Sequence, residues 1–490
     1  MWNKIALQLG LPFILISSFG LSLKALLQTP YANGWDSYFY LVQVKALIEE
    51  GQMHSSDASL IYPLMLGLQF IFKDYVLSYK ITTTLLSTTF TGLVFIFVWK
   101  KTNAQSWAFL AAAFTVFSPQ LTFFAAQYPK NLLGLVLFLG FLMSLAQRKW
   151  IWIVILLILN YFGHRMTMGL CLVLGATYLF FNLLQNTQER FKWDHKSWLI
   201  GLSLLGLIAL SFILPGLLNL ADVERLEGLL GKQAHFSTYS FWQIMEEGNR
   251  LSIFWKGELV LTNLLFFGML PYLFFKSSST LGKAIICSLL FLVFPYFEWS
   301  QTGFSYRFFL VFILLIPLLI SFLPNYYFKQ NSIPLSLGLL FLGLSFLSYT
   351  SYDPSKHDAN YKLYDRITEK ALEKLPIQPE LVIAHNALAE YFTFTSGFDA
   401  MPWLPEYQIP EDRLWRIATD IRFSEFQALM PPEKEDQVYR LSVNYFLVQE
   451  DLWQKVLGKL KQESDDALFQ HLNTWRNPHK IRPAYLLKNQ

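Results

Sequence analysis

The chain has 490 residues, of which 53% are hydrophobic, 17% aromatic and only 15% charged, and its mean hydropathy is +0.34. This is far more apolar surface than one soluble core can bury, so the composition excludes an ordinary soluble protein and indicates an integral membrane protein. The net charge of +4 is small, and we assign it to loop lysines and arginines that orient helices, which implies no nucleic-acid partner.

Apolar runs of roughly 17–25 residues can cross a bilayer as helices, and shorter runs suffice when their polar ends lie at the interface. The first run follows Lys4 and lacks a small-residue cleavage site, so it predicts a retained helix and not a signal peptide. We expect about eleven membrane helices, near residues 5–26, 77–99, 104–120, 131–147, 149–162, 166–184, 197–214, 257–275, 284–298, 308–323 and 333–349.

Lysine and arginine gather in alternate loops, as they do on the cytoplasmic side of membrane proteins. The basic loops contain Lys100 and Lys101, Arg148 and Lys149, Arg190, Lys192 and Lys196, Lys276 and Lys283, and Lys329. This alternation predicts a multi-pass protein of the cell (plasma) membrane with a cytoplasmic N-terminus and an extracytoplasmic C-terminus.

The stretch 60–72 is too short for a comfortable span, and we interpret it as an interfacial helix within a long first outer loop, 27–76. A second long outer loop covers 215–256. From residue 351 the composition becomes charged and proline-punctuated, which predicts a separate domain, 351–490. Short β-type runs at 381–384 and 445–448, with helical spacing over 451–475, predict a small α/β fold there. The expected fold class is therefore an all-α polytopic membrane bundle, 1–350, with a C-terminal α/β soluble domain.

Two cysteines, Cys171 and Cys287, lie far apart inside apolar runs, so neither a disulfide framework nor a metal-ligand pair is expected. No P-loop, dinucleotide-binding or zinc-protease motif occurs in the sequence.

Asp36 is the main catalytic candidate. It follows the first predicted span, at the edge of the membrane, and Tyr38, Phe39 and Tyr40 beside it offer rings on which a sugar could stack. A carboxylate there suits a general base acting on a substrate carried by a lipid. The alternative is that Asp36 only caps the helix that starts near Ser37.

Four cationic or basic residues lie at the outer helix ends: Lys130, His164, Arg165 and Arg307. A lysine at a helix N-terminus opposes the helix dipole but favours an anion, and charges at membrane depth are costly unless they are paired or functional. We expect these residues to bind the phosphate of a donor. The alternative for the lysine and arginines is contact with lipid headgroups.

Other polar residues allow both a functional and a structural interpretation. Asp57 is a candidate substrate-binding residue or the N-cap of the interfacial helix. Glu298 and the pair Glu246-Glu247 either share a metal with Asp36 or form solvated surface. The stretch 381–400, with His385 and Glu390, we interpret as a strand-to-helix turn with routine polar residues.

The chain resembles the GT-C superfamily of polytopic membrane glycosyltransferases, which includes oligosaccharyltransferase catalytic subunits and protein O-mannosyltransferases. The resemblance rests on Gly34-Trp35-Asp36, Tyr62-Pro63-Leu64, Ser118-Pro119 and Tyr306-Arg307. It implies polyprenyl- or dolichyl-phosphate sugar donors, transfer on the outer face, and a first-loop acid, here Asp36, as base or metal ligand. Many members carry a second acid after the third span, but 127–131 contains no carboxylate, which favours a metal-independent mechanism over a divalent metal.

The functional hypothesis is therefore an inverting glycosyltransferase that moves a sugar from a polyprenyl-phosphate-linked donor to a glycan, lipid or protein acceptor on the extracytoplasmic face. Membrane lipids are the other expected partners. The alternative is a transporter or flippase of lipid-linked glycans, in which the same charges line a path. A receptor with a ligand-binding outer domain is a third possibility, and the number of spans argues against it.

Overall fold

The computed structural model divides the chain into two compact units. Unit 1 comprises Met1–Leu27, Ala58–Leu64 and Lys80–Asp353, and unit 2 comprises Gln28–Asp57, Met65–Tyr79 and Pro354–Gln490. The structure describes residues 2–34, 36–55, 57, 59–186, 279–293, 304–322, 359–373, 382–398, 400–403, 445–449, 479–480 and 484–488, with scattered helical positions within 257–271 and 343–350.

All of the regular secondary structure among the described residues of unit 1 is helical. Its helices are α1 (Trp2–Leu26), α5 (Gln105–Phe117), α6 (Pro119–Gln127), α7 (Pro129–Ala146), α8 (Trp150–Gly163), α9 (Arg165–Asn186), α14 (Thr280–Val293) and α15 (Phe304–Leu315), which continues as the 3-10 helix η2 (Ile316–Phe322). Helices α3 (Ile61–Phe72) and α4 (Tyr75–Thr102) each contribute residues to both units.

Several of these helices are long and apolar enough to cross a bilayer. Within the described residues they are Tyr75–Thr102, Pro129–Ala146 and Arg165–Asn182, and a bent pair, α5 with α6, would make a fourth span. Shorter apolar helices include Trp150–Gly163 and Thr280–Leu292. The chain is therefore a membrane protein. The larger number of spans and their orientation stay predictions.

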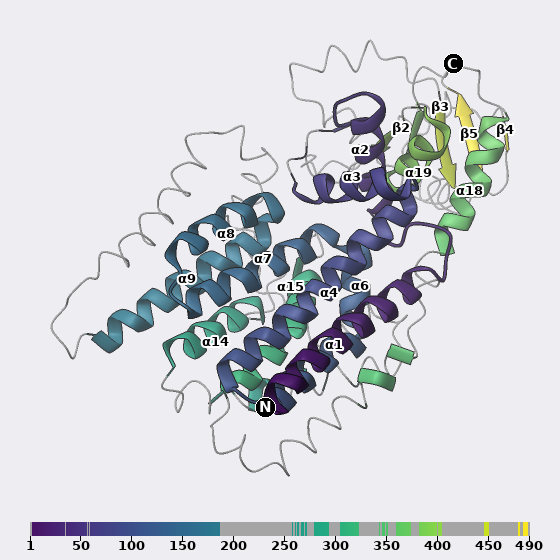
Figure 1. Ribbon diagram of the computed structural model, residues 1–490. Helices are drawn as coiled ribbons and strands as arrows, with labels where there is room; N and C mark the ends of the chain where they lie inside the picture. Colours follow the sequence, from purple (N-terminus) through teal and green to yellow (C-terminus); the bar gives the residue numbers. More distant parts are fainter. Residues whose placement is uncertain are drawn as a thin grey trace. The chain divides into compact units, whose positions relative to one another are not determined.

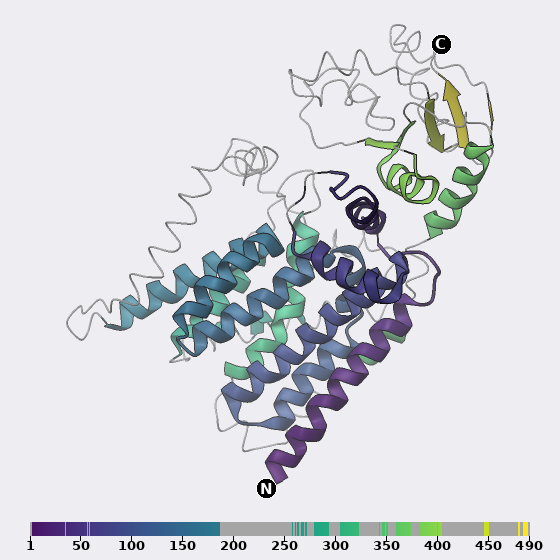
Figure 2. The same cartoon turned by 45° about the horizontal axis from the view of Figure 1, so that its top comes forward.

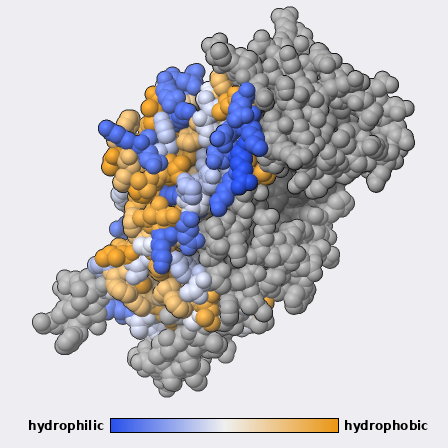
Figure 3. Space-filling view, turned by 90° about the vertical axis from the view of Figure 1, so that its right-hand side faces the viewer, coloured by the Kyte–Doolittle hydropathy of each residue, from blue (hydrophilic) through white to orange (hydrophobic). Residues whose placement is uncertain are grey.

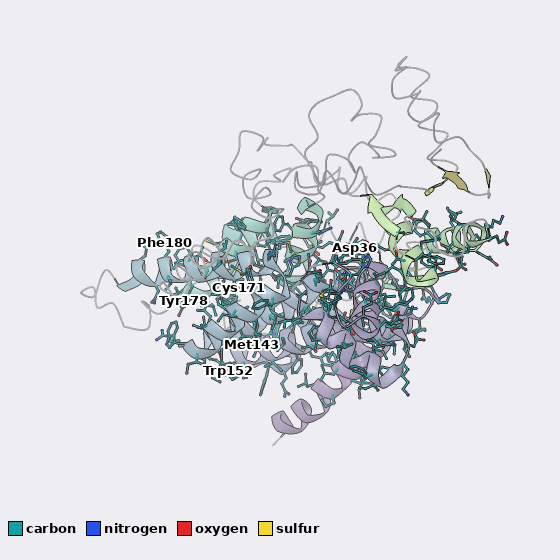
Figure 4. All side chains as sticks on the ribbon, turned by 90° about the horizontal axis from the view of Figure 1, so that it is seen from above. Asp36, Met143, Trp152, Cys171, Tyr178 and Phe180 are labelled. Carbon is teal, nitrogen blue, oxygen red and sulfur yellow. The ribbon has the colours of Figure 1, made fainter. Side chains whose placement is uncertain are left out.

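Consecutive helices of unit 1 pack side by side. Helix α7 contacts both α8 and α9, and α14 packs on α9 (Figure 1). Helix α1 packs on α4, where the Ser18 hydroxyl donates to Thr91 Oγ1 at 3.4 Å. Along α9, Cys171, Tyr178 and Phe180 follow one another (Figure 4), and the side chain changes from fully buried at Cys171 to 56% exposed at Phe180.

The apolar side chains of unit 1 are not confined to its interior. Ile16 and Ile151 are 72% and 76% exposed, an arrangement that is costly in water and favourable in a bilayer. The face shown in Figure 3 likewise carries broad hydrophobic areas next to strongly hydrophilic ones.

Helix α6 was not expected from the sequence, which predicted a turn between the third and fourth spans. Pro119 is compatible with the first position of a helix because no intrahelical bond is needed there, and every residue of Pro119–Gln127 is buried. Proline cannot donate to the preceding turn, so α5 ends at Phe117 and the chain bends by 54° into α6.

In unit 2, the described C-terminal residues form a five-stranded mixed sheet. Its strands are β1 (Val382–His385), β2 (Ala400–Trp403), β3 (Tyr445–Gln449), β4 (His479–Lys480) and β5 (Ala484–Lys488), in the order β2-β1-β3-β5-β4. Strands β1, β2 and β3 are parallel, with Val382 paired with both Ala400 and Tyr445, whereas β5 is antiparallel to β3 and β4.

Three helices of unit 2 pack on this sheet or on one another. Helix α19 (Asn386–Ser396) connects β1 to β2 and packs on both strands, on α18 (Ala359–Leu372) and on α2 (Ser37–Glu49). Figure 2 shows α18 and α19 beside the sheet. First-loop residues therefore share a compact unit with residues more than 300 positions later, a grouping that the sequence analysis did not anticipate.

Local expectations agree with the described elements at several places. Strands β1 and β3 lie at the predicted β-type runs, and α3 corresponds to the predicted interfacial helix. Other expectations lie outside the described residues: the span 197–214, the loop 215–256 with Glu246-Glu247, Glu298, and the helix at 451–475. The domain boundary at residue 350 also stays a prediction.

Candidate functional site

The segment that carries Asp36 is fastened by hydroxyl groups. Gly34 adopts a φ of +111°, a conformation that glycine tolerates and L side chains rarely adopt. The Ser37 hydroxyl lies 3.1 Å from the Ala32 carbonyl oxygen and 3.0 Å from that of Gly34. Tyr361 also donates to the Gly34 carbonyl, and burial raises the pKa of its hydroxyl, which keeps the donor protonated. The backbone before Asp36 is thus held in one conformation.

Asp36, labelled in Figure 4, occupies the N-cap position of α2 with φ −100° and ψ 12°. An aspartate at this position ordinarily accepts a hydrogen bond from the second or third backbone N–H of the helix. The Asp36 side chain makes no such capping bond. The capping interpretation therefore describes the position of Asp36 but not the present role of its carboxylate, which is partly exposed.

Glu390 was interpreted from the sequence as a routine polar residue, and its surroundings differ from that expectation. It lies on α19, is 9% exposed, and accepts a hydrogen bond from the Phe39 backbone N–H. Burial and, to a smaller extent, the negative charge of Asp36 raise the pKa of Glu390 well above its ordinary value. The local sequence offers one signal: Glu390 lies between Ala389 and Tyr391, residue types that are often buried, and both are buried in the structure.

The two aromatic residues expected to contact substrate, Tyr38 and Tyr40, pack against other aromatic rings. Tyr38 is 3% exposed and its ring packs 4.9 Å from Tyr361 and 4.7 Å from Tyr391, between centroids. Tyr40 is 6% exposed and stacks on Tyr79 at 6.3 Å. Neighbouring rings cover both side chains, and aromatic burial of this kind stabilises unit 2. The substrate-binding role of Tyr38 and Tyr40 stays a prediction.

Asp57 lies four positions before the start of α3 at Ile61, so it is not the N-cap of that helix. The Ile61 N–H instead points to the Ser59 hydroxyl, 3.4 Å away. The substrate-binding role of Asp57 stays a prediction.

Lys130 and Arg307 both lie against aromatic rings at the corner between α6 and α7. The Lys130 ammonium is 5.2 Å from the centroid of the Tyr62 ring, and the Arg307 guanidinium is 4.6 Å from that of Tyr128. Tyr128 is the residue between α6 and α7, and Lys130 is the second residue of α7. Cation–π contact fixes the direction of each side chain without neutralising its charge.

The His164-Arg165 turn packs against the same end of α7. His164 ends α8, and its Nδ1 accepts the Met166 N–H at 3.2 Å. A neutral His164 therefore carries its proton on Nε2. A side chain on Gly134 of α7 would come within 3.0 Å of His164 Cβ, so the turn and the helix are in close contact. Arg165, the first residue of α9, is exposed.

Asn131, the third residue of α7, has a buried Nδ2 with no hydrogen-bond partner among the described residues. An unsatisfied buried donor costs about 1–3 kcal/mol, so a binding partner is expected for it. Lys130, Arg165 and Arg307 lie in the first turns of α7, α9 and α15. The N-terminal end of a helix is the positive end of its dipole, so a cationic side chain there is unfavourable, and a bound anion offsets the repulsion.

Lys80 is a buried polar residue that was not expected from the sequence to have a role. It lies in α4 and is only 2% exposed, and the hydroxyls of Thr83 and Thr84 bond to its backbone carbonyl at 3.0 and 2.7 Å. A lone lysine inside the apolar run 77–99 was the available signal, because ammonium groups in membrane helices are costly unless they are paired or functional.

The predicted site residues thus fall into two groups. Unit 1 brings Lys130 and Arg307 to the α6–α7 corner and the His164-Arg165 turn against α7, while Asp36 and Asp57 belong to unit 2. Convergence of the two groups on one groove stays a prediction. In the described part of the chain, no cluster of three or more His, Cys, Asp or Glu side chains is placed to hold a metal ion.

No protein-family model matches the sequence, and no curated protein matches it either. Solved structures do match in fold. One of them is the crystal structure of ArnT from Cupriavidus metallidurans bound to undecaprenyl phosphate, with a TM-score of 0.54 over 99% of this chain and 98% of that one, at 12% sequence identity. ArnT is a GT-C glycosyltransferase. At this level of identity the likeness shows a shared fold, which is the fold expected from the resemblance of the sequence motifs to the GT-C superfamily.

Proposed function

We propose that this chain is a membrane glycosyltransferase that moves a sugar from a polyprenyl-phosphate-linked donor to an acceptor hydroxyl on the extracytoplasmic face. Its fold supports the general class, since the similar ArnT structure holds undecaprenyl phosphate. The observation that carries the proposal is the anion-favouring end of α7, where Lys130, the buried Asn131 donor and the Arg307–Tyr128 pair lie together.

The donor phosphate binds at this end of unit 1. Lys130, Arg165 and Arg307 supply positive charge, and His164 donates from Nε2. Guanidinium groups suit this task because their planar N–H groups match phosphate oxygens in pairs. As the bond between the sugar and the phosphate breaks, negative charge grows on the phosphate oxygen, and fixed cations stabilise that charge in a site of low dielectric constant.

Asp36 acts as the base. It removes the proton of the acceptor hydroxyl while the acceptor oxygen forms a bond to the anomeric carbon on the face opposite the phosphate. The bond from the anomeric carbon to the phosphate oxygen breaks, and polyprenyl phosphate leaves with the bonding electrons. The configuration at the anomeric carbon is inverted. All atoms and charges balance without a further reagent.

Asp36→Asn tests this assignment. Asparagine keeps the size and the capping ability of aspartate, so the protein should fold, but it cannot accept the proton. We expect the transfer rate to fall about 10²- to 10⁴-fold, measured as release of polyprenyl phosphate from a panel of polyprenyl-phosphate sugars by mass spectrometry. Glu50→Gln, an exposed acid at the other end of α2, is the matched control and should keep wild-type activity.

An Asp36→Asn protein with full activity would remove Asp36 from the reaction. If the wild-type protein in vesicles moves the labelled donor between leaflets and leaves its sugar-phosphate bond intact, the chain is a flippase and the transferase proposal fails.

A further inference from the structure

The N-terminus of α2 is satisfied in an unusual way. The first N–H groups of a helix have no partner inside the helix and need acceptors from elsewhere. A side chain at the N-cap normally supplies one, through the N–H of the second or third residue. Asp36 holds this position and makes no capping bond, and the third residue of α2 is Phe39.

The acceptor for Phe39 comes instead from α19. The Glu390 carboxyl group takes the Phe39 N–H, across two helices that pack directly against each other within unit 2. The Glu390 side chain is buried at this contact. The neighbouring rings of Tyr361 and Tyr391 enclose the same region and hold α18 and α19 against α2.

The protonation of Glu390 is consistent with this role. Burial favours its neutral form, and the neutral carboxyl group still offers a carbonyl oxygen to Phe39. The two acids therefore need not both carry a full charge.

We infer that Glu390 is a positioning residue for Asp36: it occupies the capping hydrogen bond of α2 and so keeps the Asp36 carboxylate out of that bond, directed to the acceptor hydroxyl. The inference rests on the proposed function, in which Asp36 is the base. The capping bond that Asp36 would normally accept is accepted instead by Glu390, which lies 354 positions after Asp36 in the chain. Asp36 is therefore correctly oriented only when α19 is docked on α2.

Two substitutions of similar shape test the inference. Glu390→Gln keeps an oxygen at the same distance from the backbone and resembles the neutral acid, whereas Glu390→Met keeps the length of the side chain and removes the acceptor. In Glu390→Met the Phe39 N–H has only Asp36 as an acceptor. We expect kcat to fall roughly 5- to 30-fold, the population change given by one capping bond, with the KM of donor and acceptor changed less than about twofold.

Glu390→Gln should restore kcat to within about threefold of wild type. Near pH 4, where the Glu390 carboxyl group is neutral in the folded protein, both variants should melt close to the wild-type temperature because α2 stays capped in each. If Glu390→Met fails to fold, Glu390→Ala with the same Gln comparison replaces it.

Three results would overturn the inference. The first is wild-type kcat in the Met and Ala variants. The second is a Gln variant as slow as the Met variant, which would mean that the acid itself takes part in the reaction. The third is a loss in Glu390→Met that appears in KM and melting temperature alone. Asp36→Asn, assayed in parallel, separates the two proposals. An active Asp36→Asn protein would remove the assignment of Asp36 as the base. If Asp36→Asn is inactive but Glu390→Met has wild-type kcat, only the role of Glu390 is removed.

Discussion

Gly134→Ala is the sharpest test of how α7 supports the candidate phosphate site. A Cβ atom added to Gly134 would lie 2.0 Å from Thr167 Oγ1, 2.9 Å from Thr167 Cβ and 3.0 Å from His164 Cβ. The two distances to Thr167 are shorter than real Cβ contacts, and the distance to His164 is tight, so α7 or the α8–α9 turn must move. Small residues permit such close approach between membrane helices.

Thr167 cannot easily rotate away. Its hydroxyl lies 2.7 Å from Asn160 Oδ1 and 2.7 Å from the His164 carbonyl oxygen, and Asn160 in turn donates to the Gly134 carbonyl at 3.2 Å. Overpacking costs about 1–3 kcal/mol, and loss of the threonine hydrogen bond adds about 1 kcal/mol, so we expect roughly 2–4 kcal/mol of destabilisation.

The assay is thermal unfolding of the purified protein in detergent, followed by donor KM. Gly134→Ala should lower the melting temperature and raise the KM, because the displaced turn carries His164 and Arg165. Gly169→Ala is the matched control: a Cβ there meets nothing within 4 Å, and alanine favours a helix over glycine by about 1 kcal/mol.

Thr167→Ala added to Gly134→Ala removes the nearest atom and should recover part of the loss, which a double-mutant cycle would measure. If Gly134→Ala and Gly169→Ala melt at the same temperature, the close contact between α7 and the α8–α9 turn is not as described.

Two further predictions follow from the charges. Arg307→Gln should raise the donor KM about 10- to 150-fold, which corresponds to the loss of a charge-assisted hydrogen bond of about 1.5–3 kcal/mol. Arg307→Lys keeps the charge but not the planar contact with Tyr128, so its KM should lie between those of Arg307→Gln and wild type. Equal KM values for the two variants would contradict a phosphate-binding role. Because the pKa of Glu390 is raised in the folded state, its contribution to stability is complete below its unfolded pKa of about 4.3 and is lost as pH rises through the folded pKa. Wild type should therefore lose stability relative to Glu390→Gln as the pH rises from about 4, so the melting temperature of Glu390→Gln minus that of wild type should increase. Asp36 and Tyr361 are the ionisable groups near Glu390. A difference independent of pH would show that Glu390 is not buried.

Much of unit 1 could be predicted from the sequence because its signals are local. Runs of apolar residues of membrane length mark α4, α7 and α9 without reference to any other part of the chain. Charged residues beside such runs, including Lys130 and Arg307, are conspicuous for the same reason. Breaks between helices were partly predictable: Pro119 marked the end of α5 but not the start of α6, since an apolar stretch as short as Pro119–Gln127 fits a buried turn equally well.

Burial of aromatic and acidic side chains was decided by the tertiary structure. Beside Asp36, the sequence shows Tyr38 and Tyr40 as exposed partners for a sugar, and only the packing of α18 and α19 against α2 covers the Tyr38 ring. Glu390 looks like a routine polar residue on an amphipathic helix until Phe39 is placed against it.

Composition and periodicity thus determined that this protein is a membrane protein built of apolar helices, with an acid after its first span and cations at other helix ends. Tertiary structure alone decided which group caps α2, which rings are covered, and that Gly134 must lack a side chain. The physical reason is distance along the chain. A membrane span can be recognised from the hydropathy of about twenty consecutive residues. The hydrogen bond from the Phe39 N–H to Glu390 forms only in the folded protein, between residues that are far apart in the sequence.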